Sequence, residues 1–211
     1  MIINQPDLGS GLIIGLTAFL IGLFSRVKKK YFVLAFVFIL IAAPFSWNLL
    51  KSYQQNRIIA FVNPNVDPLG SGYTIIQSKI AVGSGQVLGK GFLSGTQNQF
   101  NFLPERHTDF IFTVIAEEWG FLGSIILIFI YWLVIKKILD RLKKVRDPFA
   151  YQLGIGIAVY FFVHIFVNIG MALGVFPVVG LPLLFISYGG SHIICSFILM
   201  GIFFNISRNY N

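Results

Sequence analysis

Five long apolar segments, separated by polar or basic stretches, dominate the residue pattern of this chain. They cover about residues 8–25, 31–50, 117–135, 149–173 and 187–206. Each is close to the roughly 20 residues that an α-helix needs to cross the hydrocarbon core of a membrane. The pattern therefore predicts an all-α polytopic membrane protein with five transmembrane helices.

The basic residues of the chain lie between particular apolar segments. One cluster, Arg26 and residues 28–30, follows the first segment. The second cluster follows the third segment and consists of Lys136, Lys137, Arg141, Lys143, Lys144 and Arg146. Because Lys and Arg are enriched in cytoplasmic loops, we expect both clusters inside the cell. This orientation places the N-terminus and a large loop, residues 51–116, outside the cell and the C-terminus inside.

The composition supports a membrane protein and argues against other classes. Of 211 residues, 56% are hydrophobic and only 11% are charged, and the mean hydropathy is +0.79. These values lie outside the range of soluble globular domains. The net charge of +8 is explained by the two cytoplasmic clusters, so it does not indicate a nucleic-acid partner. A single cysteine, Cys195, rules out an intramolecular disulfide.

The outer segment, residues 51–116, is longer than an ordinary connection, and loops of this size are usually functional. Residues 83–91 within it are rich in glycine and include Lys90. Glycines let backbone N–H groups approach a phosphate closely. The spacing of Gly85 and Gly89, however, does not match that of a nucleotide P-loop. A flexible loop and a phosphate-binding loop are both compatible with this stretch.

Four of the eight acidic residues lie close together just before and within the third apolar segment. They are Glu105, Asp109, Glu117 and Glu118. An ionisable side chain at a membrane costs free energy unless it is paired or functional. The sequence around these residues is therefore the main candidate for a functional site.

Helical phase separates these acidic residues if residues 109–123 form one helix. At 100° per residue, a narrow face of small and polar residues is then formed by Asp109, Thr113, Ala116, Gly120 and Gly123. Such a face packs closely against other membrane helices or lines a cavity. Two structural alternatives remain. Thr108 and Asp109 could only cap the start of the helix. Glu105 and Arg106 could form a solvated ion pair.

The histidines do not form a metal-binding pattern. His107 has no second His or Cys nearby at the spacing of metal ligands. His164 is four residues from both Tyr160 and Asn168, which places a polar stripe inside the fourth predicted span. Hydrogen bonding between helices and a catalytic role are both compatible with this stripe, and the first is the commoner use.

A series of motifs resembles the SEDS family of shape, elongation, division and sporulation proteins, and its RodA branch more than its FtsW branch. The motifs are Asn63-Pro64, residues 67–73, Gln77-Ser78, and residues 80–85, 89–91, 95–97, 103–110, 116–118 and 168–171, followed by Gly174, Pro177, and residues 180–182 and 187–190. They occur in the family's order and spacing over nearly the whole chain. Two positions depart from the family pattern: Leu184 replaces a proline, and His192 replaces a small residue.

The resemblance also implies a fold. Members of the family have about ten spans with both ends inside the cell, and this chain resembles only their C-terminal half. Residues 1–211 are then expected to form a single membrane domain. Five spans with the N-terminus outside and the C-terminus inside are what remains when the first five spans are absent.

The resemblance further implies a function. Members of the family polymerise lipid II into the glycan strands of peptidoglycan at the outer face of the bacterial cytoplasmic membrane. A class B penicillin-binding protein works with them. The resemblance thus predicts a peptidoglycan glycosyltransferase of cell elongation and cell-shape maintenance. It places the family's essential aspartate at Asp109, which would act as general base on the acceptor sugar hydroxyl.

The pyrophosphate that leaves in this reaction needs positive charge. The residues that we expect to bind substrate or pyrophosphate are Lys90, Arg106, Glu105, His107 and Thr113. Lys90 and Arg106 would supply cations. A divalent ion, Mg²⁺ or Mn²⁺, could be held by Asp109 or Glu105. Thr113 belongs to the helix face along which we expect the lipid tail.

Two other functions remain open at this point. A flippase for lipid-linked cell-wall precursors would use Asp109, His164 and Asn168 to line a polar path. Such a path should carry ionisable residues through its whole depth, and this requirement favours the enzyme. A non-catalytic membrane scaffold for a penicillin-binding protein is the third possibility, because the chain resembles only half of the family fold.

Overall fold

The computed structural model of the protein describes residues 8–24, 29–46, 50–67, 70–96, 103, 105 and 107–209. Over these residues the chain forms helices joined by turns and loops, without β-strands. Long apolar stretches favour this outcome, because a backbone in a membrane must satisfy its hydrogen bonds within its own segment. The all-α prediction is confirmed for the part of the chain that the structure describes.

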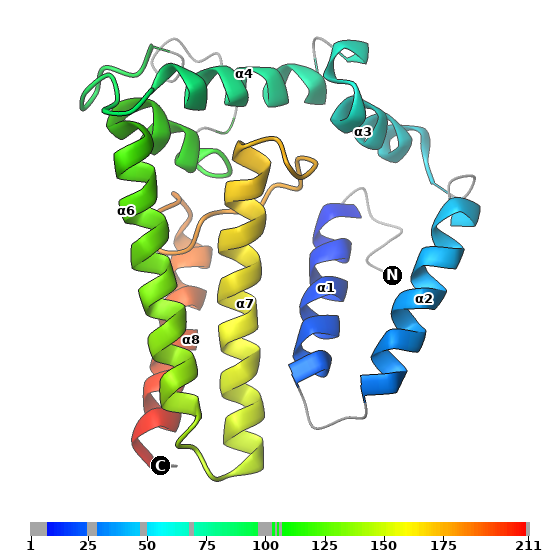
Figure 1. The fold of residues 1–211 in the computed structure, drawn as a ribbon, viewed down its shortest axis with the longest axis vertical. Helices are drawn as coiled ribbons and strands as arrows, with labels where there is room; N and C mark the ends of the chain where they lie inside the picture. The colour runs from blue at the N-terminus through cyan, green and yellow to red at the C-terminus, as the bar shows by residue number, and fades with distance from the viewer. Residues whose placement is uncertain are drawn as a thin grey trace.

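Three long helices form the main bundle of the molecule (Figure 1). They are α6 (Ile111–Leu142), α7 (Pro148–Ala172) and α8 (Gly190–Asn209). Among the described residues, these three helices are long and apolar enough to cross a membrane. The protein is therefore a membrane protein. Helix α7 is the most enclosed of the three, since it packs against α6, α8 and the first helix of the chain.

A second group of helices, α1 (Leu8–Phe24) and α2 (Lys29–Ser46), stands beside the bundle as a pair (Figure 1). Helix α1 packs against α7, where the Gln152 side-chain nitrogen donates to the Ile21 carbonyl oxygen at 3.5 Å. The first two apolar segments therefore form helices over their described residues, as predicted.

The outer segment is more ordered than a loop. It contains α3 (Ser52–Val62), a 3₁₀-helix η3 (Pro64–Val66) and α4 (Ser71–Ser84). Helix α4 lies across the end of the bundle (Figure 1). One face of α4 is buried, and its Ser78 hydroxyl donates to the Ala172 carbonyl oxygen at 2.5 Å. The predicted large connection over residues 51–116 therefore contains helices of its own, and α6 already begins within it at Ile111.

Helix α6 extends beyond both ends of the predicted span, residues 117–135. At its start, Phe112 and Ala116 are buried, so this end belongs to the packed interior. At its other end, Ile138 and Leu142 are buried between basic residues. An amphipathic pattern continues the helix after the apolar run has ended, and a count of apolar residues alone underestimates such a helix.

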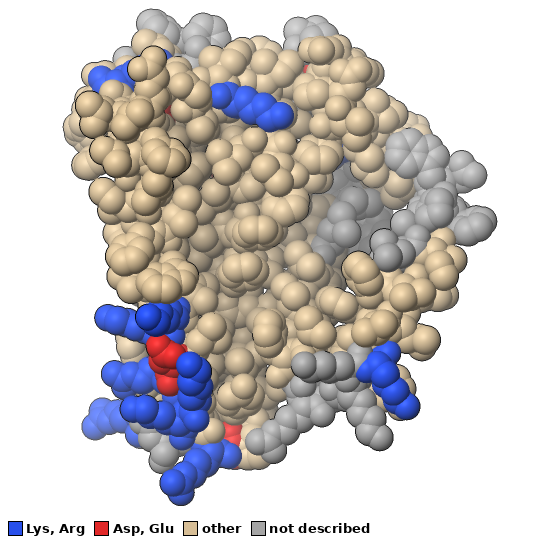
Figure 2. Space-filling view, in the orientation of Figure 1, with Lys and Arg blue, Asp and Glu red and all other residues tan. Residues whose placement is uncertain are grey.

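Charged side chains gather mainly at one end of the molecule. Figure 2 shows most of the Lys and Arg side chains at the lower end of the bundle, with others at the lower end of α2. The side chains of Lys136, Lys143 and Lys144 are exposed there. The described residues of the two basic clusters thus lie toward the same end of the molecule, which is the arrangement that the sequence pattern predicted.

Candidate functional site

Asp109 lies in a tight turn that leads into α6. The Glu105 carbonyl oxygen accepts hydrogen bonds from three successive backbone N–H groups, those of Thr108 (3.2 Å), Asp109 (3.1 Å) and Phe110 (3.3 Å). Glu105 adopts a φ of 55°, which is strained for a residue with a side chain. Phe110 is the N-cap of α6, and no side-chain hydrogen bond caps it. The alternative that Thr108 and Asp109 only cap the helix is therefore wrong.

Asn168, on α7, holds the backbone of this turn. Its side-chain nitrogen donates to the carbonyl oxygens of Asp109 (2.8 Å) and Leu181 (2.5 Å). The side chain is fully buried. One amide thus joins α7, the turn before α6 and the loop of residues 173–189. Asn168 is a hydrogen-bonding member of the predicted polar stripe, although its partners lie in loops and not on another helix.

The loop of residues 173–189 supports the same turn. The Ser187 hydroxyl donates to the Thr108 carbonyl oxygen at 2.5 Å, and it accepts a bond from the backbone N–H of Leu183 at 2.7 Å. The Tyr188 backbone N–H donates to the His107 carbonyl oxygen at 2.9 Å. Together with Asn168, these bonds fix the carbonyl groups of three consecutive residues. The directions in which their side chains leave the backbone are thereby fixed as well.

The carboxyl group of Asp109 is half-buried. Burial raises its pKa, the negative charge of Glu105 raises it further, and a hydrogen bond from Thr108 acts in the opposite direction. Gly180 approaches this carboxyl closely, since a Cβ on Gly180 would lie 3.5 Å from Asp109 Oδ2. A half-buried carboxylate of raised pKa, on a backbone held from two sides, is suited to accept a proton.

The other members of the polar stripe lie between helices. The His164 ring packs on the rings of Tyr160, with centroids 4.2 Å apart, and of His192, with centroids 5.5 Å apart. His164 is buried, and its Nδ1 has no hydrogen-bond partner within the described residues. The contact joins α7 to α8.

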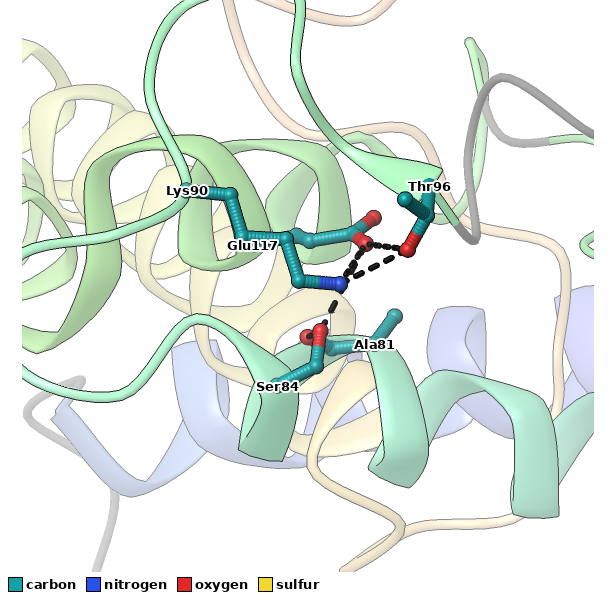
Figure 3. A network of polar contacts seen from close by, with 5 residues as sticks. All are labelled: Ala81, Ser84, Lys90, Thr96 and Glu117. Atoms are coloured by element: carbon teal, nitrogen blue, oxygen red, sulfur yellow. Dashed lines mark hydrogen bonds and ion pairs between the residues drawn. The ribbon is translucent and has the colours of Figure 1, made fainter.

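A second polar cluster surrounds Glu117 (Figure 3). Lys90 Nζ lies 2.8 Å from Glu117 Oε1, and it also donates to the Thr96 hydroxyl at 2.8 Å. The hydroxyls of Thr96 and Ser84 donate to the same carboxylate oxygen at 3.3 and 3.4 Å. The Glu117 side chain is fully buried, whereas 28% of the Lys90 side chain is exposed. A buried carboxylate is stable only when its charge is compensated in this way.

Helix α6 is interrupted at Gly120, whose φ of 66° and ψ of −161° are not helical. A continuous helix would join the N–H groups of residues 121 and 122 to the carbonyl groups of residues 117 and 118. The segment of residues 86–91 satisfies all four groups instead, through bonds from Phe121 to Gln86 (2.9 Å), Leu122 to Val87 (3.1 Å), Lys90 to Glu117 (3.0 Å) and Gly91 to Glu118 (3.0 Å). A side chain at Gly120 would collide with the Gly89 backbone nitrogen at 2.3 Å.

The interruption corrects the predicted helix face. Asp109 lies before α6, and the helical phase changes at Gly120. Asp109, Gly120 and Gly123 therefore do not share one continuous helix face. Only the first part of that face is realised, where Thr113 and Ala116 are both buried.

The structure brings some of the predicted site residues together and separates others. Glu105 and Asp109 share one turn, and the Glu105 carboxylate accepts from the Thr108 hydroxyl at 3.1 Å. His107, in the same turn, is exposed. Thr113 is fully buried, and its hydroxyl donates to the Phe110 carbonyl oxygen at 2.6 Å. Lys90 belongs to the separate cluster around Glu117. Arg106 lies outside the described residues.

Sequence reasoning missed two residues that organise the site. Glu117 was noted as acidic but was not paired with Lys90, because 27 residues separate the two. The sequence placed Asn168 and Asp109 together only on the polar path of a flippase, and it did not predict the hydrogen bond between them, which spans 59 residues. A glutamate inside an apolar helix and an asparagine inside a membrane span were the available signals that each needed a partner.

Comparison with known proteins identifies the relatives of this chain. The family model for FtsW, RodA and SpoVE, described as cell cycle protein, matches residues 1–211. The chain is 43% identical to the peptidoglycan glycosyltransferase MrdB of Escherichia coli K12 over 207 residues, which are 98% of this chain and 56% of that protein. It is 38% identical to the peptidoglycan glycosyltransferase RodA of Treponema pallidum, with 89% of this chain and 44% of that protein covered.

A solved structure is also similar. It comes from work on the structural coordination of polymerization and crosslinking by a peptidoglycan synthase complex. The TM-score is 0.78 at 28% identity, and the match covers 99% of this chain and 58% of the other. The chain thus spans about half the length of the relatives it matches. Because the family model covers every residue of it, the chain belongs to the FtsW, RodA and SpoVE family, as the motifs around Asp109 predicted.

Proposed function

We propose that this chain carries the catalytic aspartate of a peptidoglycan glycosyltransferase, which polymerises lipid II during cell elongation and cell-shape maintenance. The observation that carries the proposal is the carboxyl group of Asp109, half-buried and of raised pKa on a backbone fixed by Asn168 and Ser187. The relatives from Escherichia coli and Treponema pallidum, both named peptidoglycan glycosyltransferases, support the same reaction.

In the proposed reaction, the 4-hydroxyl of an acceptor sugar attacks the anomeric carbon of a donor sugar. The hydroxyl proton passes to the carboxylate of Asp109, and the bond from the anomeric carbon to the pyrophosphate oxygen breaks. Undecaprenyl pyrophosphate leaves with the electron pair of that bond. A general base of this kind contributes about 10²- to 10⁴-fold to the rate, and it works best when its pKa is near the working pH. The raised pKa of Asp109 moves the group in that direction.

The leaving pyrophosphate requires cations near the turn. Arg106, next to Glu105 in the chain, is the first candidate. Lys90 is the second, because its ammonium group already neutralises Glu117. His107, exposed on the same turn, would contact the substrate. Thr113 would contact the substrate only by van der Waals packing and not by a hydrogen bond, because its hydroxyl already donates to the Phe110 carbonyl group.

A divalent ion would fit this turn. Glu105 and Asp109 present two carboxylates close enough for one to raise the pKa of the other, and oxygen ligands of this kind suit Mg²⁺ or Mn²⁺. Within the described residues, no group of three or more His, Cys, Asp and Glu side chains could hold a metal ion. The substrate phosphates would complete the ligand set, as is usual for Mg²⁺. Such an ion would stabilise the charge of the pyrophosphate.

The lipid tail of the substrate would lie against the outer part of α6. An apolar cavity of about 170 Å³ lies there between α4 and α6, and Ala116 and Gly120 contribute to its lining. The sequence placed the tail beside both residues, although Gly120 lies at the interruption of the helix. Small residues leave room for an isoprenoid chain beside the helix.

The proposal includes the topology and surroundings of the protein. Helices α1, α2, α6, α7 and α8 would be five spans in the bacterial cytoplasmic membrane, with the N-terminus outside and the C-terminus inside. Residues 1–211 would be one membrane domain, equivalent to the C-terminal half of a ten-span fold. A class B penicillin-binding protein is the proposed partner, and the similarity to a chain from a peptidoglycan synthase complex supports it. Membrane lipids would surround the spans.

The test is a polymerisation assay with purified protein and lipid II. The chain would be assayed alone, and also after co-expression with the segment of the Escherichia coli relative that lies outside the match. Asp109→Asn should abolish the formation of glycan strands in whichever preparation is active. The matched control is Asp67→Asn, an equal change in the outer segment, and it should leave polymerisation within twofold of the unaltered protein.

Each outcome of this assay distinguishes the proposed functions. Near-normal polymerisation by Asp109→Asn would remove Asp109 from the mechanism. Absence of polymerisation in both preparations would contradict the enzyme. Movement of lipid II across vesicles would then indicate a flippase, and retained binding to a penicillin-binding protein would indicate a scaffold.

A further inference from the structure

A second cavity lies at the basic end of the molecule, between α1, α6 and α7. Its volume is about 660 Å³, within the usual range of ligand sites. Leu20 and Phe24 of α1, Ile135 of α6, and Ala158 and Phe162 of α7 contribute apolar walls. The cavity is thus a largely apolar groove bounded by three helices.

The groove has charged residues at one end. Lys136, Asp140 and Lys143, all near the end of α6, line it there. Lys136 Nζ lies 4.8 Å from the centre of the Trp132 ring, which also lines the groove. Lys143 pairs with Asp140 at 2.7 Å, but both side chains are largely exposed, at 74% and 51%. An exposed pair of this kind is weak, so an anionic ligand can replace Asp140 as the partner of Lys143.

We propose that this groove binds an anionic phospholipid, with an acyl chain against the apolar walls and the headgroup phosphate at Lys136 and Lys143. The polarity of the groove matches that of such a molecule, because the walls are apolar and the positive charges stand at one end only. Lysine ammonium groups bind phosphate well as compact charges. Trp132 beside Lys136 is typical of a side chain at the membrane–water boundary.

The site is distinct from the proposed catalytic turn. From the interruption at Gly120 to Lys136, α6 rises about 24 Å, which is most of the hydrocarbon thickness of a membrane, and Asp109 lies before the interruption at the other end of the helix. The phosphate of a lipid in the groove would therefore lie on the membrane face opposite to Asp109. By the distribution of Lys and Arg this is the cytoplasmic face, where anionic lipid headgroups attract basic residues (Figure 2). The inference does not depend on the polymerase reaction.

The experiment measures lipid binding to the 211-residue chain in neutral detergent. The delipidated protein is titrated with phosphatidylglycerol, and native mass spectrometry counts the bound lipids. The double variant Lys136→Gln/Lys143→Gln should raise the half-saturating lipid concentration about tenfold. The matched control is Lys137→Gln/Lys144→Gln, which removes the same charge from exposed residues that do not line the groove. It should change the concentration by less than twofold.

Lipid chemistry supplies a second measurement that requires no variant. Phosphatidylcholine and a phosphatidylglycerol with six-carbon chains should each bind at least tenfold more weakly, and inorganic phosphate should not compete. Thermal unfolding of both double variants checks that they fold.

Several results would overturn the proposal. Equal losses in the two double variants would indicate general surface attraction, and equal binding of both headgroups would remove the role of the lysines. Equal binding of short chains or competition by phosphate would remove the role of the groove. If the bound lipid is lost on co-expression with the rest of the Escherichia coli relative, the groove is filled by that segment of protein and not by a lipid.

Discussion

Two carboxylates near the outer end of α6 differ in almost every physical respect. Glu117 is fully buried, and its charge is balanced by Lys90 at 2.8 Å and by two hydroxyls. Asp109 is half-buried beside Glu105, and its pKa is raised. The carboxylate of Glu117 is held in an ion pair with Lys90, whereas burial and the charge of Glu105 both raise the pKa of Asp109. The comparison separates a carboxylate whose contacts hold two segments together from the one that we propose as the general base.

The hydrogen bonds around Glu117 and Asp109 differ as well. Around Glu117 the side chain itself is bonded, and the bonds join the segment of residues 86–91 to α6. Around Asp109 it is mainly the backbone that is bonded, through Asn168. Contacts to the backbone hold a catalytic residue in place and leave its side-chain atoms available to substrate. A structural residue is instead held by bonds to its side-chain atoms.

The largest expected effect concerns activity. Asp109→Asn should lower the polymerisation rate about 10²- to 10⁴-fold. It should not lower the thermal unfolding temperature, because a raised pKa means that ionised Asp109 costs stability at neutral pH and the neutral amide does not. Glu117→Gln should show the opposite pattern, with a lower unfolding temperature and a much smaller loss of rate. If both variants lose rate alike, the two carboxylates do not have different roles.

The next effect concerns stability. Lys90→Met leaves the buried charge of Glu117 without its cation and should destabilise the protein by about 3 kcal/mol in denaturant unfolding. The double variant Lys90→Met/Glu117→Met removes both charges and should recover most of this loss. Lys143→Met, which breaks the exposed pair with Asp140, is the control and should cost less than about 1 kcal/mol. A double variant no more stable than Lys90→Met would contradict the structural role.

A smaller loss is expected at the helix interruption. Gly120→Ala places a side chain at a φ of 66° and against the Gly89 backbone, and it should cost about 2 kcal/mol or somewhat more. Gly201→Ala is the control, since Gly201 is inside α8 with nothing near the added carbon. It should be neutral or stabilise by up to about 1 kcal/mol. Equal effects in the unfolding measurements would mean that α6 is continuous at Gly120.

The smallest effect is a shift in the pH dependence of polymerisation. The rate should fall as the pH drops through the raised pKa of Asp109, because a protonated base cannot accept a proton. Glu105→Gln removes a charge that raises this pKa, so the acid limb should move to lower pH. Thr108→Val removes a hydrogen bond that lowers the pKa, so the limb should move to higher pH. Shifts in the same direction in the two variants would show that the limb belongs to another group.

The helices were largely predictable from the sequence, whereas the connections at the site were not. Long apolar runs specify helices such as α7 and α8 within a few residues. The interruption at Gly120 was hidden, because the surrounding residues have a good helical pattern and the hydrogen bonds that replace the helix come from another segment. Helices α3 and α4 were missed because both are short, at 11 and 14 residues, and each mixes a short apolar stretch with polar residues.

In the candidate site, the sequence predicted the acidic residue but not the residues that hold it in place. Asp109 was found because an acidic residue beside a membrane helix is conspicuous and because its motif resembles that of a known family. Its partners Asn168 and Ser187 lie 59 and more residues away, and such contacts depend on how the helices pack and on the path of the loop between α7 and α8. Local sequence carries little information on either.

The hydrogen bonds across the interruption in α6 also restrict how the length of this chain can vary in evolution. Residues 86–91 pair in fixed order with residues 117–122, so the addition or removal of one residue between Gln86 and Gly91 would misalign the four bonds. Natural variation in length, and any tag inserted by an experimenter, should therefore be excluded from this segment.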